Sequence, residues 1–161
     1  MSEFQGINLQ EVEIKNEQLT CADNYIESLN LSNFRNHKSY KVDFPNCPIA
    51  FIGKNGSGKT NILEGISLFE KGRGFRKETI NNFININNLD KGFKINSTLQ
   101  NQEINFEINI FNSDKNLKKL SVNNNFDKES IRHFESLFSI IYFLPEMERL
   151  FVSTPSSRRN F

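Results

Sequence analysis

The segment Gly53–Thr60, which reads GKNGSGKT, constrains the fold more than any other part of this 161-residue chain. It matches the pattern G-x-x-x-x-G-K-[ST], whose glycines let the backbone approach a phosphate and whose successive amides form an anion-binding nest. An apolar run, residues 48–52, precedes it and is typical of a strand buried on both faces. Four apolar residues then follow at helical spacing, before Lys71-Gly72: Ile62, Leu63, Ile66 and Phe69. A strand, this loop and a helix in this order favour a nucleotide-phosphate site over a glycine- and serine-rich surface loop.

Each part of the loop has an expected role. The dipole of the helix that begins here adds positive potential at the phosphates. Lys59 is expected to reach the β- and γ-phosphates, and the hydroxyl of Thr60 is expected to ligate Mg2+. ATP and Mg2+ are therefore the expected cofactors. The loop residues predicted to bind the nucleotide are Gly53, Lys54, Asn55, Gly56, Ser57, Gly58, Lys59, Thr60 and Asn61.

Hydrolysis of a nucleotide needs more than this loop. A metal-holding aspartate is expected at the end of a second buried strand, with a group that orients water. The later apolar run IIYFLPE, residues 140–146, ends in Pro145-Glu146 instead. Glu146 as a catalytic base is one interpretation, but the proline and the missing aspartate argue against it. We therefore assign no catalytic residue.

The rest of the pattern predicts an α/β fold with a mixed sheet, an antiparallel β meander and few helices. Apolar and polar residues alternate in several segments, which predicts strands. A helix is expected over 130–137, and a second fully buried strand over 139–144. The predicted alternating strands are 25–31, 38–44, 93–99, 103–111 and 117–122.

Composition and charge narrow the class of protein. Residues 1–30 carry one lysine against six acidic residues, whereas residues 31–80 carry nine basic against four acidic residues. The middle third is therefore the expected place of anion contact. Residues 1–23 are interpreted as a weakly ordered extension, and residues 24–161 as an incomplete ATP-binding domain. Two cysteines, no apolar stretch of about 18 residues and an acidic start favour a cytoplasmic protein over a secreted or membrane-spanning one.

Five motifs occur in order along the chain and carry a resemblance. They are Asn33-Phe34-Arg35-Asn36-His37, GKNGSGKTNILEGI, Gly72-Arg73-Gly74-Phe75-Arg76, Leu144-Pro145-Glu146 and Pro155-Ser156-Ser157-Arg158-Arg159-Asn160-Phe161. This series resembles the RecF family of bacterial DNA replication and repair proteins, whose head is similar to SMC-type and ABC-type ATPases. The resemblance implies an incomplete ABC/SMC-type P-loop NTPase lobe, which ends where a second lobe is expected to begin.

The resemblance also implies roles and partners. Arg35 and Asn36 are expected against the nucleotide, and a solvated turn is the alternative. Arg73 and Arg76 are expected near the nucleotide or DNA, or simply as cations at a helix end. Arg158 and Arg159 are expected to bind DNA phosphate or to pair with acids, and Pro145-Glu146 to lie where related heads sense the γ-phosphate. The implied partners are DNA, single-stranded or at duplex junctions, RecR and RecO, and a second copy in an ATP-dependent homodimer.

The chain also departs from the family. A signature motif, an Asp-Glu strand and a switch histidine, all expected farther along such a protein, are missing from these 161 residues. Weak nucleotide binding and negligible hydrolysis by this chain alone are therefore expected. The alternatives are another P-loop enzyme, such as a small kinase, and a non-functional remnant. The predicted meander after the P-loop helix fits an ABC-type lobe better than a kinase.

Overall fold

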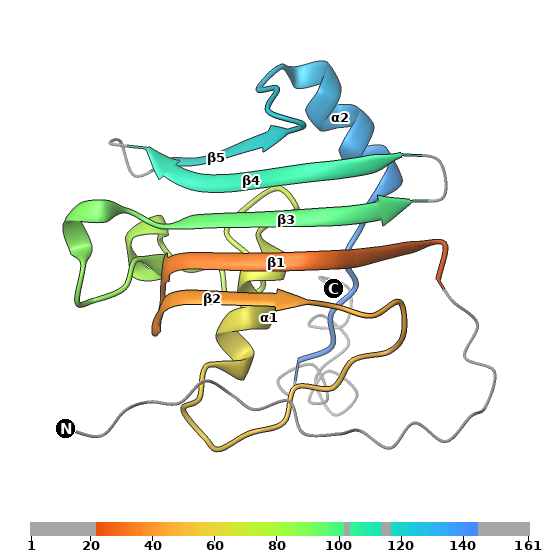
Figure 1. The fold of residues 1–161 in the computed structure, drawn as a ribbon. Coiled ribbons are helices and arrows are strands. Elements are labelled where there is room, and N and C mark those ends of the chain that lie inside the picture. Colours follow the sequence, from red (N-terminus) through yellow and green to blue (C-terminus); the bar gives the residue numbers. More distant parts are fainter. Residues whose placement is uncertain (1–21, 102–103, 114–116, 145–161) are drawn as a thin grey trace, which may run out of the picture.

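The computed structural model describes residues 22–101, 104–113 and 117–144. A five-stranded sheet with the order β2-β1-β3-β4-β5 dominates it, and neighbouring strands are antiparallel (Figure 1). The elements are β1 (Asn24–Phe34), β2 (His37–Asp43), α1 (Lys59–Ser67), the 3-10 turns Ile80–Phe83 and Leu89–Lys91, β3 (Lys94–Asn101), β4 (Asn105–Ser113), β5 (Leu117–Val122) and α2 (Lys128–Leu137). The five alternating strands predicted from the sequence are therefore confirmed, with small shifts at their ends.

The core lies between one face of the sheet and the segments that carry the two helices. Leu29 and Leu31 of β1, Ile95 of β3 and Ile110 of β4 are fully buried on this face. Gly65 of α1 lies against them, since an added Cβ would stand 3.0 Å from a methyl group of Leu31. The missing side chain at Gly65 is thus what lets α1 approach the sheet closely.

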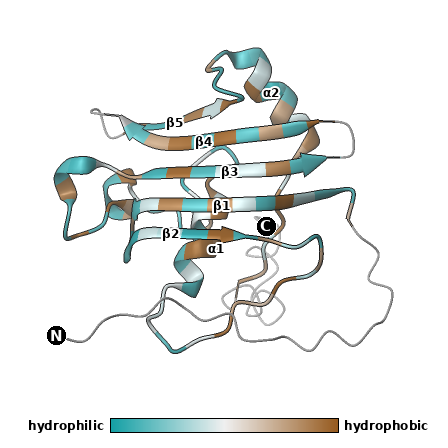
Figure 2. Ribbon diagram, viewed as in Figure 1, coloured by the Kyte–Doolittle hydropathy of each residue, from teal (hydrophilic) through white to brown (hydrophobic). Residues whose placement is uncertain are grey.

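The opposite face of the sheet is polar. Asn30, Asn96 and Asn109 occupy one row across β1, β3 and β4, and the Asn96 amide donates to the Asn109 side chain. The alternation of apolar and polar bands along these strands is visible in Figure 2. Asparagine is therefore one of the polar residues on this face of the sheet.

The two short apolar runs were expected to be buried strands, and this prediction is wrong for both. Residues 48–52 and 139–144 form no strand, and each presents large apolar side chains to solvent: Ile52 is 77% exposed and Ile141 is 97% exposed. Neither run has a neighbouring strand among the residues described, and a strand without a partner leaves its backbone groups unpaired. The described sheet is consequently antiparallel throughout, without the parallel pairs of a mixed sheet.

The helix after the loop is confirmed, but it is shorter than predicted. It ends at Ser67, where the amides of Leu68 and Phe69 turn back to carbonyls three residues earlier and close a tighter turn. Leu63 is 48% exposed and so lies outside the core that the spacing predicted for it. The later helix, α2, is confirmed, and the carboxylate of Asp127 caps it by accepting from the amide of Ser130 at 2.7 Å.

The last turn of the α1 segment is tied to β5 by a lysine. The Lys118 ammonium donates to the carbonyl oxygens of Leu68, at 2.9 Å, and Glu70. Burial lowers the pKa of Lys118 to about 8, against the opposing attraction of Glu135 and Glu70. A cation at the carboxyl end of a helix also complements the helix dipole.

Some predictions fall outside the described residues. These are the extension over residues 1–21, the Pro145-Glu146 segment, and Arg158 and Arg159. In the part of the chain that is described, no helix is long and apolar enough to cross a membrane.

Candidate phosphate-binding site

The loop between residues 53 and 58 turns sharply through glycines. Gly56 and Gly58 have φ angles of 82° and 96°, in the left-handed region that side chains disfavour. Gly58 is also the N-cap of α1, and a Cβ placed there would lie 2.5 Å from the His37 ring and 2.7 Å from the Asn36 amide nitrogen. Position 58 therefore accepts only glycine, both for its backbone angles and for lack of space.

Backbone donors gather along this loop. The amides of Gly56, Gly58, Lys59 and Thr60 donate to no acceptor within the described residues. All four residues line an open pocket of about 390 Å³. The other residues of its lining are Asn36, Asn55, Asn61 and Arg76. The first turn of a helix always leaves its amides unpaired, and here they border a pocket that also holds two cations. The arrangement favours an anion.

The side chain of Lys59 folds over the same loop. Its ammonium donates to the carbonyl oxygens of Gly53, at 2.7 Å, and Lys54, at 2.9 Å. These are neutral acceptors, and charged phosphate oxygens make stronger hydrogen bonds with an ammonium. The hydroxyl oxygen of Ser57, buried in the same loop, has no hydrogen-bond partner among the described residues. Both features fit a loop that can exchange internal contacts for contacts with a ligand.

Asn36 and Asn61 connect the β1–β2 turn to the pocket. The Asn61 amide donates to the Asn36 side-chain oxygen at 2.9 Å, and the Asn36 amide reaches the Gly56 carbonyl at 3.5 Å. Both residues line the pocket. The structure thus brings together the predicted residues from two distant segments of the chain, the F-R-N motif and the phosphate loop.

Arg35 is placed differently from Asn36. Its guanidinium forms a bidentate pair with Glu64 of α1, with N–O distances of 2.8 and 2.7 Å, and it stacks over Phe83 at 5.1 Å. Arg35 does not belong to the lining of the pocket, although its turn borders it. Its expected contact with nucleotide stays a prediction.

The two arginines of the G-R-x-F-R segment separate. Arg76 lines the phosphate pocket and contacts both Asn61 and Glu64, each at 3.3 Å. Arg73 is exposed and lines a different surface hollow with Thr79, Leu117 and Lys118. Of the two, only Arg76 lines the pocket at the loop Gly53–Thr60, and the expected contacts of both with nucleotide or DNA stay predictions.

Two residues of the site were not predicted: Glu64 and His37. Glu64 is fully buried and joins Arg35 to Arg76. His37 is buried, and its Nε2 lies 3.3 Å from the Gly58 carbonyl oxygen. Burial lowers the pKa of His37, while the hydrogen bond with Gly58 acts in the opposite direction. Glu64 lies on roughly the opposite side of the helix from the predicted apolar stripe, so the spacing gave no signal for its burial. Its two arginine partners lie in other segments, and no sequence spacing reveals them.

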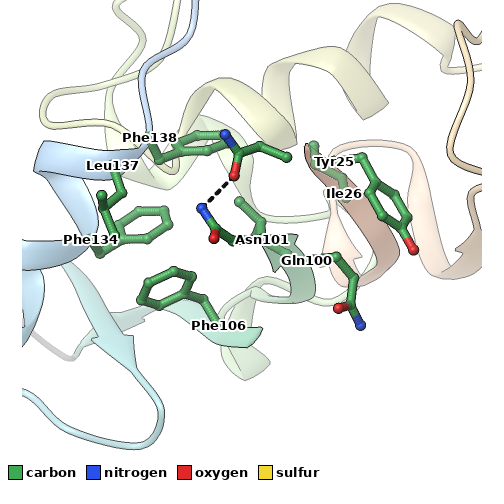
Figure 3. Close-up of a pocket in the computed structure, with 10 residues that line it drawn as sticks. Tyr25, Ile26, Gln100, Asn101, Phe106, Phe134, Leu137 and Phe138 are labelled. Atoms are coloured by element: carbon green, nitrogen blue, oxygen red, sulfur yellow. Dashed lines mark hydrogen bonds between the residues drawn. The ribbon is translucent and has the colours of Figure 1, made fainter. Parts of the chain in front are cut away.

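A second pocket lies at the other end of β1. It measures about 170 Å³ and is mainly apolar (Figure 3). Ile26 borders it, together with the stacked rings of Phe134 and Phe138 and the ring of Phe106, which meets Phe134 edge-on. No basic side chain is among the described residues that line it, so it offers no cation to a phosphate. Nor do the described residues include a cluster of three or more His, Cys, Asp or Glu side chains that would hold a metal.

A glycine-turned loop with free amides, a lysine and a helix start defines the class as a P-loop nucleotide-binding fold. Residues 25–152 match the family model described as an AAA ATPase domain, and the chain belongs to this family. The predicted resemblance to RecF is confirmed. The chain is 34% identical over 137 residues to the DNA replication and repair protein RecF of Rickettsia akari, and 36% identical over 138 residues to that of Rickettsia conorii.

Solved structures agree with this relationship. A structure of the recombination mediator protein RecF-ATP in the RecFOR pathway matches with a TM-score of 0.66 and 28% identity, over 85% of this chain and 37% of that one. A chain from a structural study of ATP-driven dimerization and DNA-stimulated activation of SMC ATPases matches with a TM-score of 0.69 over 84% of this chain and 96% of that one; its 20% identity supports the fold alone. The expected lobe of a P-loop NTPase is therefore confirmed, and the RecF-like reading is favoured over a kinase.

The match covers only part of the relatives. The chain spans 37% of the length of the two RecF proteins, although 85% of its own residues align with them. The match alone consequently does not assign the activity and the partners of a whole RecF protein to this chain.

Proposed function

We propose that the loop Gly53–Thr60 binds the triphosphate of ATP, in the manner of a RecF-like ATPase head. The observation that carries this proposal is the set of unpartnered amides around a pocket that also holds Lys59 and Arg76. A triphosphate would give these amides charged acceptors and would draw Lys59 away from the carbonyls of Gly53 and Lys54. The similarity to a RecF-ATP structure supports ATP as the ligand.

Mg2+ would accompany the nucleotide. The residues present fit this ion, because Thr60 is an exposed residue that lines the pocket and carries a hydroxyl. Mg2+ takes oxygen ligands and keeps several waters. No carboxylate lines the pocket in the part of the chain that the structure describes. The ion would therefore be held by Thr60, by phosphate oxygens and by water, and it would neutralise phosphate charge.

Nucleotide-dependent stabilisation tests this proposal. A ligand that binds only the folded state raises stability by roughly 2.7 kcal/mol at a concentration 100 times its Kd. The unfolding temperature of the whole chain should rise with MgATP, and the rise should shrink when EDTA removes the metal. A broad transition that MgATP does not move would favour the alternative of a remnant without function.

The same pocket also limits what the chain would do alone. Because no described carboxylate faces the pocket, nothing among these residues would orient and deprotonate an attacking water. We therefore propose ATP binding with negligible autonomous hydrolysis. Turnover of ATP by the purified chain that Lys59→Ala abolishes would overturn this part of the proposal.

In the cell, the proposed role is ATP-controlled binding to single-stranded or gapped DNA during replication and repair, in the cytoplasm. This proposal rests on the RecF similarity and on the basic excess of residues 31–80. An ATP-dependent homodimer and the partners RecR and RecO belong to the same proposal. Phosphate contacts would make DNA affinity fall steeply with salt, so fluorescence anisotropy with a gapped duplex at several salt concentrations tests it. An affinity that ignores both salt and MgATP would argue against it.

A further inference from the structure

Arg35 and Arg76 contact Glu64 in different ways. Arg35 binds both carboxylate oxygens, at 2.8 and 2.7 Å, and its side chain is 18% exposed. Arg76 reaches one oxygen with Nη1 alone, at 3.3 Å, and its side chain is 38% exposed. Arg35 thus forms a bidentate ion pair with Glu64, whereas Arg76 uses a single nitrogen and its other donors can make further contacts.

The remaining donors of Arg76 border the phosphate pocket. Nη1 also donates to the Asn61 side-chain oxygen at 3.3 Å, while Nε and Nη2 donate to no acceptor that the structure describes. A guanidinium carries five N–H donors in a planar fork that matches phosphate oxygens. Nη1 of Arg76 is therefore engaged, whereas Nε and Nη2 remain available to a ligand in the pocket.

Glu64 is the fixed point of this arrangement. It lies on α1 four residues after Thr60, on the same side of the helix, and it is fully buried. A buried carboxylate is costly unless it is paired, and Arg35 supplies that pairing without entering the pocket. Glu64 lies on the same helix as Lys59 and Thr60, so its contact with Arg76 joins that arginine to the element that carries them.

We propose that Glu64 is a positioning residue of the phosphate site. It anchors Nη1 of Arg76 and so directs the free edge of that guanidinium toward the phosphates of the bound nucleotide. Arg35 compensates the charge of Glu64 and has a structural role. This inference rests on the proposed ATP site. It adds a residue that positions Arg76, the second cation of that site after Lys59.

A thermodynamic cycle on the whole chain tests the inference. MgATP affinity would be measured by calorimetry for the wild type, Glu64→Gln, Arg76→Gln and the double variant. Each single change should weaken binding about tenfold, the effect of losing one charge-assisted contact. The double variant should bind no more weakly than Arg76→Gln alone, since Glu64 acts only through Arg76.

Glu78→Gln is the matched control. Glu78 lies two residues after Arg76 and pairs with Asn82, away from the pocket, so its loss should leave MgATP affinity unchanged. A purely structural role for Glu64 would instead give effects that multiply, with the double variant roughly a hundredfold weaker than the wild type.

Other outcomes are equally decisive. Unchanged affinity in a folded Glu64→Gln or Arg76→Gln variant overturns the inference but leaves the ATP site standing. Absence of MgATP binding by the wild type overturns both. If Glu64→Gln does not fold, Glu64→Asp takes its place in the cycle, because it keeps the charge of the carboxylate while withdrawing it from Arg76.

Discussion

The two ends of helix α1 differ in how their backbone groups are hydrogen-bonded. At its first turn, the amides of Lys59 and Thr60 donate to no acceptor in the part of the chain that the structure describes, and both residues line a pocket. At its far end, the buried Leu68 and Phe69 anchor the chain, and Lys118 binds the carbonyls that follow. The fold satisfies the negative end of the helix dipole with its own cation and leaves the positive end for a ligand. Variants at the two ends should consequently separate binding from stability.

The largest expected effect is at the ligand end. Lys59→Ala removes the ammonium that would bind the β- and γ-phosphates and should weaken MgATP affinity about a hundredfold, or roughly 3 kcal/mol. The unfolding temperature without nucleotide should hardly change, because the side-chain hydrogen bonds that the structure describes for Lys59 go to carbonyls of its own exposed loop. Calorimetry and thermal unfolding check the two halves of this prediction. A large loss of stability would contradict the separation of the two ends.

The next effect is a pH dependence at the anchored end. The folded-state pKa of Lys118 is lowered to about 8, so between pH 8 and the usual value for lysine the unfolded chain binds more protons than the folded one. Stability should accordingly rise with pH, and the contribution of Lys118 from pH 8 to pH 10 is roughly 2 kcal/mol. Urea unfolding at several pH values measures this slope.

Lys118→Met is the control for that measurement. It removes the titrating ammonium and should flatten the rise between pH 8 and pH 10, whatever it does to stability at neutral pH. MgATP affinity of the folded variant should remain that of the wild type. An equal slope in the wild type and the variant would show that Lys118 is not the group responsible.

A smaller effect is expected where α1 crosses the sheet. Gly65→Val would place methyl groups against Leu31, Phe34 and Ile95 and should lower the free energy of unfolding by about 1–3 kcal/mol. Chemical denaturation measures the loss. Gly72→Ala serves as the comparison, since a Cβ at Gly72 meets no atom within 4 Å, although its φ of 104° adds backbone strain. Gly65→Val is expected to cost more than Gly72→Ala, and the reverse order would contradict the close approach of α1.

The smallest effect concerns a region remote from the pocket. Asp127→Ala removes the N-cap of α2, which should slightly lower the unfolding temperature and leave MgATP binding intact. The carboxylate of Asp127 accepts hydrogen bonds from the backbone amide of Ser130 and, second in effect, from its hydroxyl, and both lower the pKa of Asp127. The stabilisation from this cap is present above the ordinary pKa of aspartate and is lost on acidification. Circular dichroism at neutral and acidic pH, compared between wild type and variant, tests this point.

The sequence predicts well what depends on neighbours along the chain. The alternation of β1 to β5 and the loop pattern around Lys59 are local, so strands and loop were both expected where they occur. The buried pairing of Glu64 with Arg35 depends on residues 29 positions apart, and no periodicity reports it. The strand predictions for the two apolar runs were wrong for a related reason, because a strand needs a neighbouring strand as well as a suitable composition. A run such as residues 48–52 shows how apolar a segment is but contains no information about what lies beside it.

Among the strands that the structure describes, β2 and β5 stand at the two edges of the sheet, each with one side unpaired. Exposed lysines lie on both of these strands, Lys38 and Lys41 on β2 and Lys119 on β5. Charged side chains on an edge strand disfavour the addition of a further strand from a second copy of the chain, since like charges would meet. Self-association by continuous sheet growth is therefore disfavoured, and any pairing of two copies is better served by surfaces away from these two edges.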